Sequence, residues 1–335
     1  MKALVLQEAG QPPVFGDHAN PSPQSGEALV RLDAAALNHR DLWIMHGQYP
    51  GIVLPIILGS DGTGTVESVV DDGESWVDQS VIINPSIGWG DNPKTQGSDF
   101  TILGLPRPGT FAEYISVPVE NLAPRPSHLT ASQAAALPLA GLTAWRALVT
   151  RGQAQPGEKV LISGVGGGVA LFAAQFALAL GCEVYVTSSS DSKLQQAIAL
   201  GASGGVNYCN DDFLSAAQAL APDGYDVVID SAGGDGFGNL VRLLAPAGRL
   251  AFYGGTRGKW PALLPQHMFY KQVSILATTM GSPQDFAAMI GFVNTTKLIP
   301  VVDRVFPAKD GALAFSHLDS GDQFGKVVIS FNETD

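Results

Sequence analysis

Cysteine is scarce in this chain. Among 335 residues there are two, Cys182 and Cys209, and neither belongs to a Cys-x-x-Cys pair. The sequence therefore offers neither a disulfide framework nor the thiolates of a structural zinc site. We expect both cysteines to pack as small buried residues.

Basic residues are also few. Lysine and arginine number 19 against 31 acidic residues, which gives a net charge of −12. Because no basic stripe offsets this excess, we expect no nucleic-acid partner and no anionic membrane surface. No apolar run reaches membrane-spanning length, and the first residues, MKALVLQEAG, lack the features of a signal peptide. The sequence predicts a cytoplasmic globular protein, long enough for two domains.

A glycine-rich turn lies in residues 158–193, between a short apolar run and a helix of small residues. Residues 160–162 read VLI, as a parallel strand covered on both faces requires. Glycines let the chain turn sharply and let a pyrophosphate approach the backbone, beside free N–H groups of the next helix. The residues predicted to form this cradle are Gly164, Gly166, Gly167, Gly168 and Val169.

The full G-x-G-x-x-G pattern is absent, and an ordinary strand-to-helix connection is the alternative reading of the turn taken alone. The recurrence of strand-like runs decides between these readings. Six of them alternate with alanine- and leucine-rich stretches, at 160–163, 183–187, 205–208, 226–230, 249–253 and 273–277. This alternation predicts a complete doubly wound parallel sheet, a Rossmann domain.

The end of the second strand indicates which cofactor binds. NAD sites usually carry an acid there, whereas this strand ends in hydroxyl residues, including Ser188 and Ser189. Hydroxyls donate to a 2′-phosphate, and Lys193 and Tyr208 would complete a phosphate pocket. Taken alone, Lys193 is equally readable as a solvated helix lysine. Together these residues favour NADP.

The first part of the chain has a different pattern, with short strand-like runs at 2–6, 28–37, 64–70, 80–84 and 111–117. Residues 88–109 lack periodicity and predict a long loop. Residues 128–150 and 282–293 predict helices, and 301–306 and 326–331 predict strands that return to the first domain. We expect a mainly β catalytic domain at 1–126 and 280–335, a cofactor domain at 127–279, and a substrate cleft between them.

Six segments together resemble the medium-chain dehydrogenase/reductase superfamily over the whole chain. They are AALNHRDLW (35–43), LPIILGSDGTGTV (54–66), GTFAEY (109–114), LPLAGLTAWRAL (137–148), SGVGGGV (163–169) and FGKVVI (324–329). The resemblance implies a GroES-like β domain joined to the Rossmann domain. It also implies a homodimer.

Zinc members of this superfamily hold a catalytic metal with two cysteines and a histidine. The matching positions here are Asn38, Ser60 and Leu139, which are poor zinc ligands, and the loop that holds a structural zinc in those relatives has no cysteine. We therefore expect no metal. The resemblance points to the zinc-independent quinone oxidoreductase branch, which includes zeta-crystallins.

This branch implies reduction of quinones or α,β-unsaturated carbonyls by hydride transfer from NADPH. Such substrates delocalise the resulting oxyanion and need no Lewis acid. Two alternatives stay open. One is a zinc-type alcohol dehydrogenase, as the wider family name suggests, and the other is a non-catalytic, crystallin-like NADPH-binding protein. The physiological substrate does not follow from the sequence.

Three residues are candidates for the chemistry. Asn38 replaces a zinc ligand and is expected to donate to a substrate carbonyl, although a backbone-capping amide is the alternative. Tyr49 would donate its phenol or line the cleft wall. Arg40 stands where zinc relatives carry a proton-relay hydroxyl, and a structural ion pair with Asp61 is the stronger reading.

The resemblance also implies contacts to the cofactor. Thr143 and the pair Gly254 and Gly255 would lie near the nicotinamide half. The other implied contacts include His39 near the pyrophosphate, Ser231 and Ala232 beside the adenosine, and Lys326 near a phosphate. The remaining cofactor positions are Tyr253 and Phe324.

Overall fold

The computed structural model describes residues 1–71 and 73–332 and divides the chain into two compact units. The first unit holds Met1–Ala140 and Ser282–Asp335, and the second holds Gly141–Gly281. The second unit is thus a continuous segment inserted into the first.

A six-stranded parallel sheet forms the centre of the second unit. Its strand order is β13-β12-β11-β14-β15-β16. The bounds are β11 (Lys159–Ile162), β12 (Glu183–Ser188), β13 (Gly204–Asn207), β14 (Tyr225–Asp230), β15 (Leu244–Phe252) and β16 (Ser274–Ala277). All six predicted strands are confirmed. β15 begins at Leu244, earlier than the predicted residue 249.

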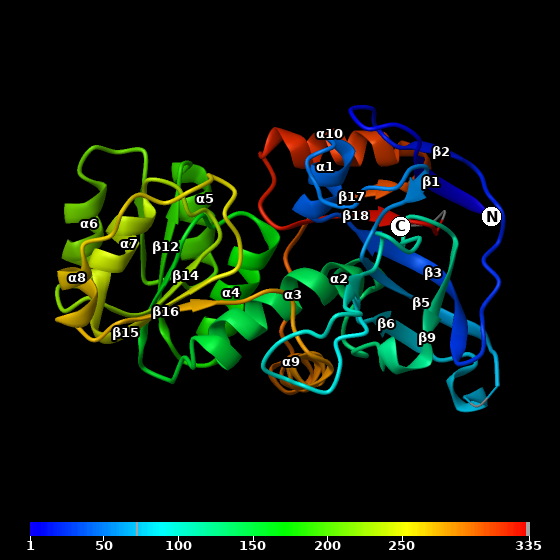
Figure 1. Cartoon of the computed structure of the whole chain (residues 1–335), viewed down its shortest axis with the longest axis horizontal. Helices are drawn as coiled ribbons and strands as arrows, with labels where there is room; N and C mark the ends of the chain where they lie inside the picture. The colour runs from blue at the N-terminus through cyan, green and yellow to red at the C-terminus, as the bar shows by residue number, and fades with distance from the viewer. Residues whose placement is uncertain (72, 333–335) are drawn as a thin grey trace. The chain divides into compact units, whose positions relative to one another are not determined.

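Helices lie on both sides of this sheet (Figure 1), as its buried apolar strands require. They are α4 (Gly168–Ala179), α5 (Asp191–Ala199), α6 (Phe213–Leu220), α7 (Phe237–Leu243) and α8 (Pro265–Phe269). The strand order reverses between β11 and β14. At such a reversal the carboxyl ends of parallel strands open a crevice for a ligand. The Rossmann arrangement predicted from the sequence is confirmed.

The first unit is mainly β. Its largest sheet runs β10-β6-β5-β3-β18-β17, and β9 also pairs with β3. A three-stranded sheet runs β2-β1-β4. The bounds are β1 (Lys2–Leu6), β2 (Val14–Asp17), β3 (Glu27–Ala36), β4 (Ile56–Ile57), β5 (Asp61–Val69), β6 (Ser80–Ile83), β9 (Tyr114–Pro118), β10 (Leu122–Pro124), β17 (Val302–Pro307) and β18 (Lys326–Ser330).

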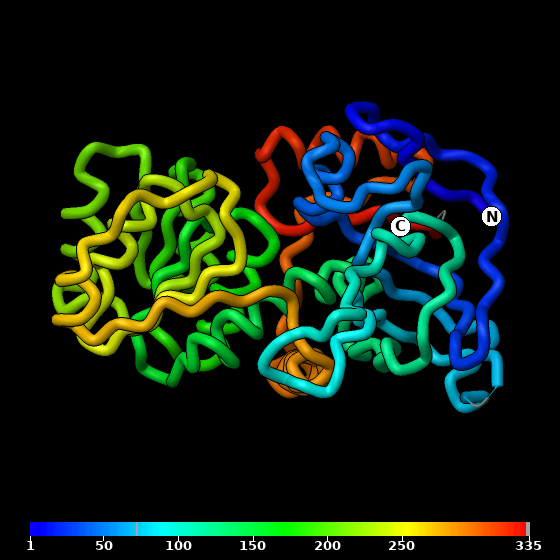
Figure 2. Tube along the Cα trace, in the orientation of Figure 1, coloured from blue at the N-terminus to red at the C-terminus, as the bar shows by residue number. Residues whose placement is uncertain are grey.

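The predicted return of the C-terminal segment is confirmed, because β18 lies between β3 and β17. β18 is antiparallel to β3, with Ser330 opposite Ala34, and parallel to β17. Figure 2 shows this red segment beside the blue segment that holds β3. The first unit extends to Ala140, beyond the predicted 126, because helix α2 (Ala131–Ala136) packs against β3, β5 and β18.

The predicted loop at 88–109 contains regular structure. Strand β8 (Thr101–Ile102) pairs with β7 (Ser86–Ile87), and the ring of Trp89 meets that of Phe100 edge-on. Strands of two residues have no periodicity to detect, which explains why the sequence indicated only a loop.

The other helices are α1 (His39–Met45), α3 (Pro138–Trp145), which a π-helical turn (Arg146–Arg151) continues, α9 (Pro283–Thr296) and α10 (Gly311–Ser320). The helices predicted at 128–150 and 282–293 are therefore confirmed. Ser282 caps α9, since its Oγ accepts from the N–H of Asp285 at 3.1 Å. Across residues 1–71 and 73–332, no helix combines the length and apolar character that crossing a bilayer requires.

Candidate functional site

The glycine-rich turn after β11 has the backbone conformation that its glycines permit. Gly164 has φ +68° and Gly166 has φ +130°. A Cβ placed on Gly166 would lie 2.8 Å from Cδ and 3.4 Å from Nζ of Lys193. The Lys193 side chain therefore lies directly against the turn.

Space remains beside two other glycines of the turn. A Cβ on Gly164 or on Gly167 would meet nothing within 4 Å. Gly167 is the N-cap of α4 and has no side chain to occupy the N–H groups at the start of this helix. The turn thus leaves room, backbone donors and a nearby cation, which fits the pyrophosphate or phosphate of a dinucleotide.

No acid stands at the carboxyl end of β12. Ser188 ends the strand, is buried, and accepts from the N–H of Ser190 at 3.2 Å, while Ser189 is exposed. The first acid beyond it, Asp191, accepts from Asn207 Nδ2 at 2.8 Å. The Asp191 carboxylate therefore binds a residue of β13. In NAD sites the acid at this strand end instead accepts a hydrogen bond from a ribose hydroxyl.

Tyr208 follows the neighbouring strand β13 and pairs with a residue that sequence reasoning missed. The Arg257 guanidinium carbon lies 5.2 Å from the centre of the Tyr208 ring. This cation–π geometry holds a second positive charge beside Tyr208. Arg257 lies in an irregular segment far along the chain, so no local pattern marks it.

Asp230 is a second residue that the sequence did not single out. It is buried at the end of β14, accepts a hydrogen bond from Ser163 Oγ and accepts from the N–H of Gly233 at 2.9 Å. The carboxylate thus ties the glycine-rich turn to the turn that contains Ser231 and Ala232. The motif DSAGG marks a turn in sequence, but nothing local indicates its partner.

The loop after β15 holds the next predicted cofactor residues. Tyr253 donates its N–H to Asp230 O at 3.0 Å, and burial raises the pKa of its phenol. A Cβ on Gly254 would lie 2.9 Å from Ser231 O, so only glycine fits there, and Gly255 is exposed.

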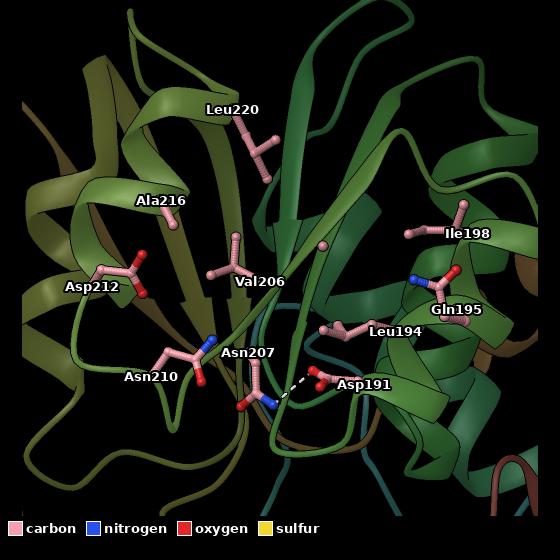
Figure 3. Close-up of a pocket in the computed structure, with 11 residues that line it drawn as sticks. Asp191, Leu194, Gln195, Ile198, Val206, Asn207, Asn210, Asp212, Ala216 and Leu220 are labelled. Carbon is pink, nitrogen blue, oxygen red and sulfur yellow. Dashed lines mark hydrogen bonds between the residues drawn. The ribbon is translucent and has the colours of Figure 1, made fainter.

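A separate pocket of about 360 Å³ lies at the open edge of β13, between α5 and α6 (Figure 3). Its lining includes Asp191, Leu194, Val206, Asn207 and Leu220. None of the residues predicted to bind cofactor lines it. This pocket is therefore distinct from the glycine-rich turn.

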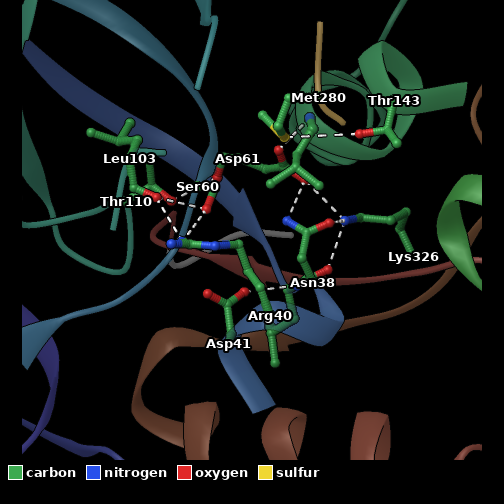
Figure 4. A network of polar contacts seen from close by, with 12 residues as sticks. Asn38, Arg40, Asp41, Ser60, Asp61, Leu103, Thr110, Thr143, Met280 and Lys326 are labelled. Atoms are coloured by element: carbon green, nitrogen blue, oxygen red, sulfur yellow. Dashed lines mark hydrogen bonds and ion pairs between the residues drawn. The ribbon is translucent and has the colours of Figure 1, made fainter. Parts of the chain in front are cut away.

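In the first unit, a buried polar network surrounds Asn38 (Figure 4). Lys326 Nζ donates to Asn38 Oδ1 at 2.6 Å, to Asp61 Oδ2 at 2.9 Å and to Leu37 O at 2.6 Å. Asn38 Nδ2 also donates to Asp61 Oδ2 at 2.9 Å, and the N–H of Leu139 donates to Asp61 Oδ1 at 2.6 Å. The Asn38 side chain is thus held by a cation and a carboxylate.

Arg40 makes different contacts from those expected. Its Nη1 donates to Ser60 Oγ at 2.8 Å and to Leu103 O at 2.9 Å, and its guanidinium carbon lies 5.2 Å from the centre of the Tyr49 ring. The cation that pairs with Asp61 is Lys326, so the expected Arg40–Asp61 pair is corrected. The sequence missed this because Lys326 and Asp61 are far apart in the chain.

Asp41 belongs to the same network. Its Oδ2 accepts from the N–H of Asn38 at 2.8 Å and so caps the start of α1. Burial raises the pKa of the Asp41 carboxyl to about 6, against the opposing attraction of Arg40. Asp41 Oδ1 is buried without a hydrogen-bond partner among the described residues. The Asp41 carboxyl therefore gains or loses its proton near pH 6.

The remaining predicted residues are spread over both units. His39 is exposed at the start of α1, and Phe324 donates its N–H to Asp303 Oδ1 at 3.0 Å. Thr143 is buried in the second unit, with Oγ1 3.9 Å from Met280 Sδ. All three N–H groups of Lys326 are used in the network, so the expected phosphate contact would require it to give one up.

The donor set at the zinc-like positions does not fit a zinc ion. Asn38 and Ser60 present an amide and a hydroxyl, both already hydrogen-bonded, and Leu139 has no donor atom. The nearby carboxylate of Asp61 already holds the Lys326 ammonium. Within the described part of the chain, no three His, Cys, Asp or Glu side chains gather as ligands would.

Comparisons with known proteins cover most of the chain. Residues 24–127 match the alcohol dehydrogenase GroES-like domain, and residues 168–295 match the zinc-binding dehydrogenase family. A zinc-type alcohol dehydrogenase-like protein of Leptosphaeria maculans is 38% identical, over 93% of this chain and 92% of its own. The quinone oxidoreductase of Mus musculus is 27% identical, over 98% and 97%.

The fold is also shared with solved structures. The crystal structure of an NAD-dependent alcohol dehydrogenase superposes with a TM-score of 0.93 at 37% identity, covering 99% of this chain and 100% of that one. By sequence identity, the quinone oxidoreductase is a more distant relative than the zinc-type protein. The sequence resemblance had pointed to the quinone oxidoreductase branch instead.

Proposed function

Because the chain belongs to the medium-chain dehydrogenase/reductase superfamily, we propose that this oxidoreductase uses NADPH to reduce quinones or α,β-unsaturated carbonyls without zinc. When bound, NADPH supplies a hydride, which adds two electrons and one hydrogen to the substrate. The residues of this chain bind the dinucleotide, receive the developing oxyanion and bring a proton.

The position of Lys193 carries the cofactor proposal. Its side chain lies against Gly166, close to where a phosphate would meet the glycine-rich turn. Arg257 and Tyr208 add a second cation and a phenol at the end of β13. Since β12 ends in Ser188 and not in an acid, a 2′-phosphate would meet hydroxyl donors at this strand end.

The network around Asn38 supports chemistry without a metal. A Lewis acid contributes several kcal/mol at a developing oxyanion, so a chain lacking zinc ligands suits substrates that are easier to reduce. Quinones and enones delocalise the negative charge over a ring or an enolate. A single well-placed donor then contributes about 3 kcal/mol.

Asn38 is the proposed donor, and Tyr49 the proposed source of a proton. The Arg40 guanidinium carbon lies 5.2 Å from the centre of the Tyr49 ring, a cation–π contact that would hold the ring in place. Solvent would return the proton to Tyr49, so the step balances as one hydride and one proton added across the substrate.

The test uses purified protein treated with a chelator. NADPH and NADH are offered separately with a panel of small quinones and 2-alkenals, and the absorbance of the reduced nicotinamide is followed. We expect turnover with NADPH, at a kcat/KM at least tenfold above that with NADH. Inertness across the panel would contradict the proposal, and a preference for NADH would contradict its cofactor.

The second candidate function is a zinc-dependent alcohol dehydrogenase. The description of the Leptosphaeria maculans relative as zinc-type favours it. It requires about one zinc per chain by elemental analysis and alcohol oxidation that the chelator abolishes. The donor set around Asn38 argues against this outcome.

We further propose a cytoplasmic homodimer. The described cysteines are both free, which suits a reducing compartment. Cys182 is buried as expected, whereas the expectation of burial is corrected for Cys209, which is exposed. Leu264, Phe269 and Tyr270 are exposed in the segment that leads into β16, the edge strand of the parallel sheet. Such an apolar patch beside an open strand edge suits a second copy of the chain.

A further inference from the structure

The ammonium group of Lys326 is fully occupied by the protein itself. Its three N–H groups meet three oxygens at 2.6–2.9 Å, from Leu37, Asn38 and Asp61. The Lys326 side chain is 3% exposed and that of Asp61 0%. A cation held this completely is a fixed part of the site, unlike a flexible surface lysine.

Asn38, Asp61 and Lys326 close a ring of hydrogen bonds. Asp61 Oδ2 accepts from both Lys326 Nζ and Asn38 Nδ2, while Lys326 Nζ also donates to Asn38 Oδ1. The amide N–H used in this ring is the one on the same side as Oδ1. The other N–H therefore points away from the ring, and among the described residues no acceptor is recorded for it.

The ring also prevents the amide from turning over. A flipped Asn38 would place its NH₂ group against the Lys326 ammonium and its oxygen against the Asp61 carboxylate. Asp61 is itself anchored by the N–H of Leu139, and the N–H of Asn38 is anchored by Asp41. A cation on the amide oxygen also polarises the amide and strengthens its remaining N–H as a donor.

We propose that Lys326 and Asp61 are positioning residues that hold the Asn38 carboxamide with one N–H fixed toward the substrate oxygen. This inference rests on the proposed function, in which Asn38 receives the oxyanion. Lys326 thereby stands in for the metal cation as a source of positive charge, acting through the amide and not on the substrate directly.

The first experiment compares Lys326→Ala with Lys309→Ala, whose lysine is exposed in the same unit. We expect kcat to fall about 100-fold in the first variant, as when an oxyanion donor is lost, with NADPH affinity within twofold. Propylammonium has the same three carbons and ammonium group that the substitution removes. Adding it should raise kcat at least tenfold in Lys326→Ala and leave kcat unchanged in Lys309→Ala. A kcat within threefold of the control would overturn the proposal.

A second variant guards against misfolding, because removing Lys326 alone leaves the Asp61 charge buried without a partner. The double variant Asp61→Asn, Lys326→Met removes both charges. We expect it to fold, bind NADPH and retain the low kcat of Lys326→Ala. Recovery of wild-type kcat in the double variant would show that the pair only maintains the fold.

A third measurement does not depend on turnover. In ¹⁵N-asparagine-labelled wild-type protein, the Asn38 side chain should give two separate amide proton signals, one protected from exchange by Asp61. In the double variant we expect these signals to move and to exchange at similar rates. Equal exchange of both protons in the wild type would overturn the positioning role even if no reductase activity were found.

Discussion

Lys326 and Asp61 form an ion pair that is almost completely buried, and buried pairs of this kind often contribute little net stability. Their value lies in orientation, because each charge specifies one end of the Asn38 amide. The Arg40 guanidinium and the Asp41 carboxylate add a second pair of opposite charges to the same region. The network is therefore electrically balanced without any bound ion.

The Asp41 carboxyl should make stability depend on pH in an unusual direction. Its pKa rises from 3.8 to about 6, mainly because of burial, so the folded state binds this proton more tightly than the unfolded chain does. The contribution of Asp41 to the free energy of unfolding is therefore highest below about pH 4. It falls by about 3 kcal/mol as pH rises through 6, at about 1.4 kcal/mol per pKa unit.

Comparison with Asp41→Asn isolates this effect, because other groups cancel in the difference. We expect the free energy of unfolding of wild type minus that of the variant to decrease between pH 4.5 and pH 7, as measured by urea denaturation. A difference that stays constant over this range would mean that the carboxyl is ionised throughout.

Lys193 should discriminate between the two nicotinamide cofactors. Replacing it with alanine removes a charge-assisted contact to phosphate, which is worth about 1.5–3 kcal/mol. We expect NADPH affinity to fall about 10- to 100-fold in Lys193→Ala, with NADH affinity within threefold, by fluorescence titration. Lys159→Ala, at the amino end of β11, is the matched control. An equal loss for both cofactors would place Lys193 at a phosphate that they share.

Among the secondary-structure elements, the β11–α4 connection places different backbone requirements on two adjacent glycines. Gly166 combines φ +130° with contact to Lys193, whereas Gly167 has φ −76° and open space at its Cβ position. Gly166 is therefore required for its backbone conformation, whereas Gly167 matters only for the space that a dinucleotide would need.

Alanine substitutions at these two positions should have different effects. Gly166→Ala should lower the free energy of unfolding by about 1–3 kcal/mol, because a Cβ at this φ is strained and displaces Lys193. Gly167→Ala should change stability by less than about 1 kcal/mol but weaken NADPH binding, since its methyl enters the open space. Equal stability of both variants in urea would refute the strain argument.

At the scale of the molecule, the net charge of −12 and the exposed apolar side chains of Phe269 and Tyr270 have opposite consequences for association. Net charge keeps copies apart, whereas burial of apolar side chains favours their association. Phe269 is 65% exposed and Tyr270 85% exposed, so a partner could bury both.

The double substitution Phe269→Glu, Tyr270→Glu should dissociate the proposed dimer. We expect the wild type to sediment at twice the 35.0 kDa of the chain and the variant at 35.0 kDa. Leu313→Glu, at a residue 60% exposed on α10, serves as a control that should remain dimeric. A monomeric wild type would exclude the homodimer directly.

Local sequence was sufficient for the parallel sheet, the glycine-rich turn and the return of the C-terminal strands, because strand and helix periodicities are set by nearby residues. The pairing of the two-residue strands β7 and β8 and the end of the first unit at Ala140 were not recoverable, since they depend on pairing and packing. The candidate residues at the ends of β11 and β12 followed from their place after strands.

The partners of those residues were decided by tertiary structure alone. Lys326 reaches Asp61 and Asn38 across nearly the length of the chain, and Arg257 reaches Tyr208 from a loop without pattern. Hydrogen bonds and ion pairs form only between atoms a few ångströms apart. For residues far apart in the sequence, these distances are set by the folded structure and not by any local pattern. The chain's periodicity therefore specified the scaffold, and close packing specified which polar groups meet on it.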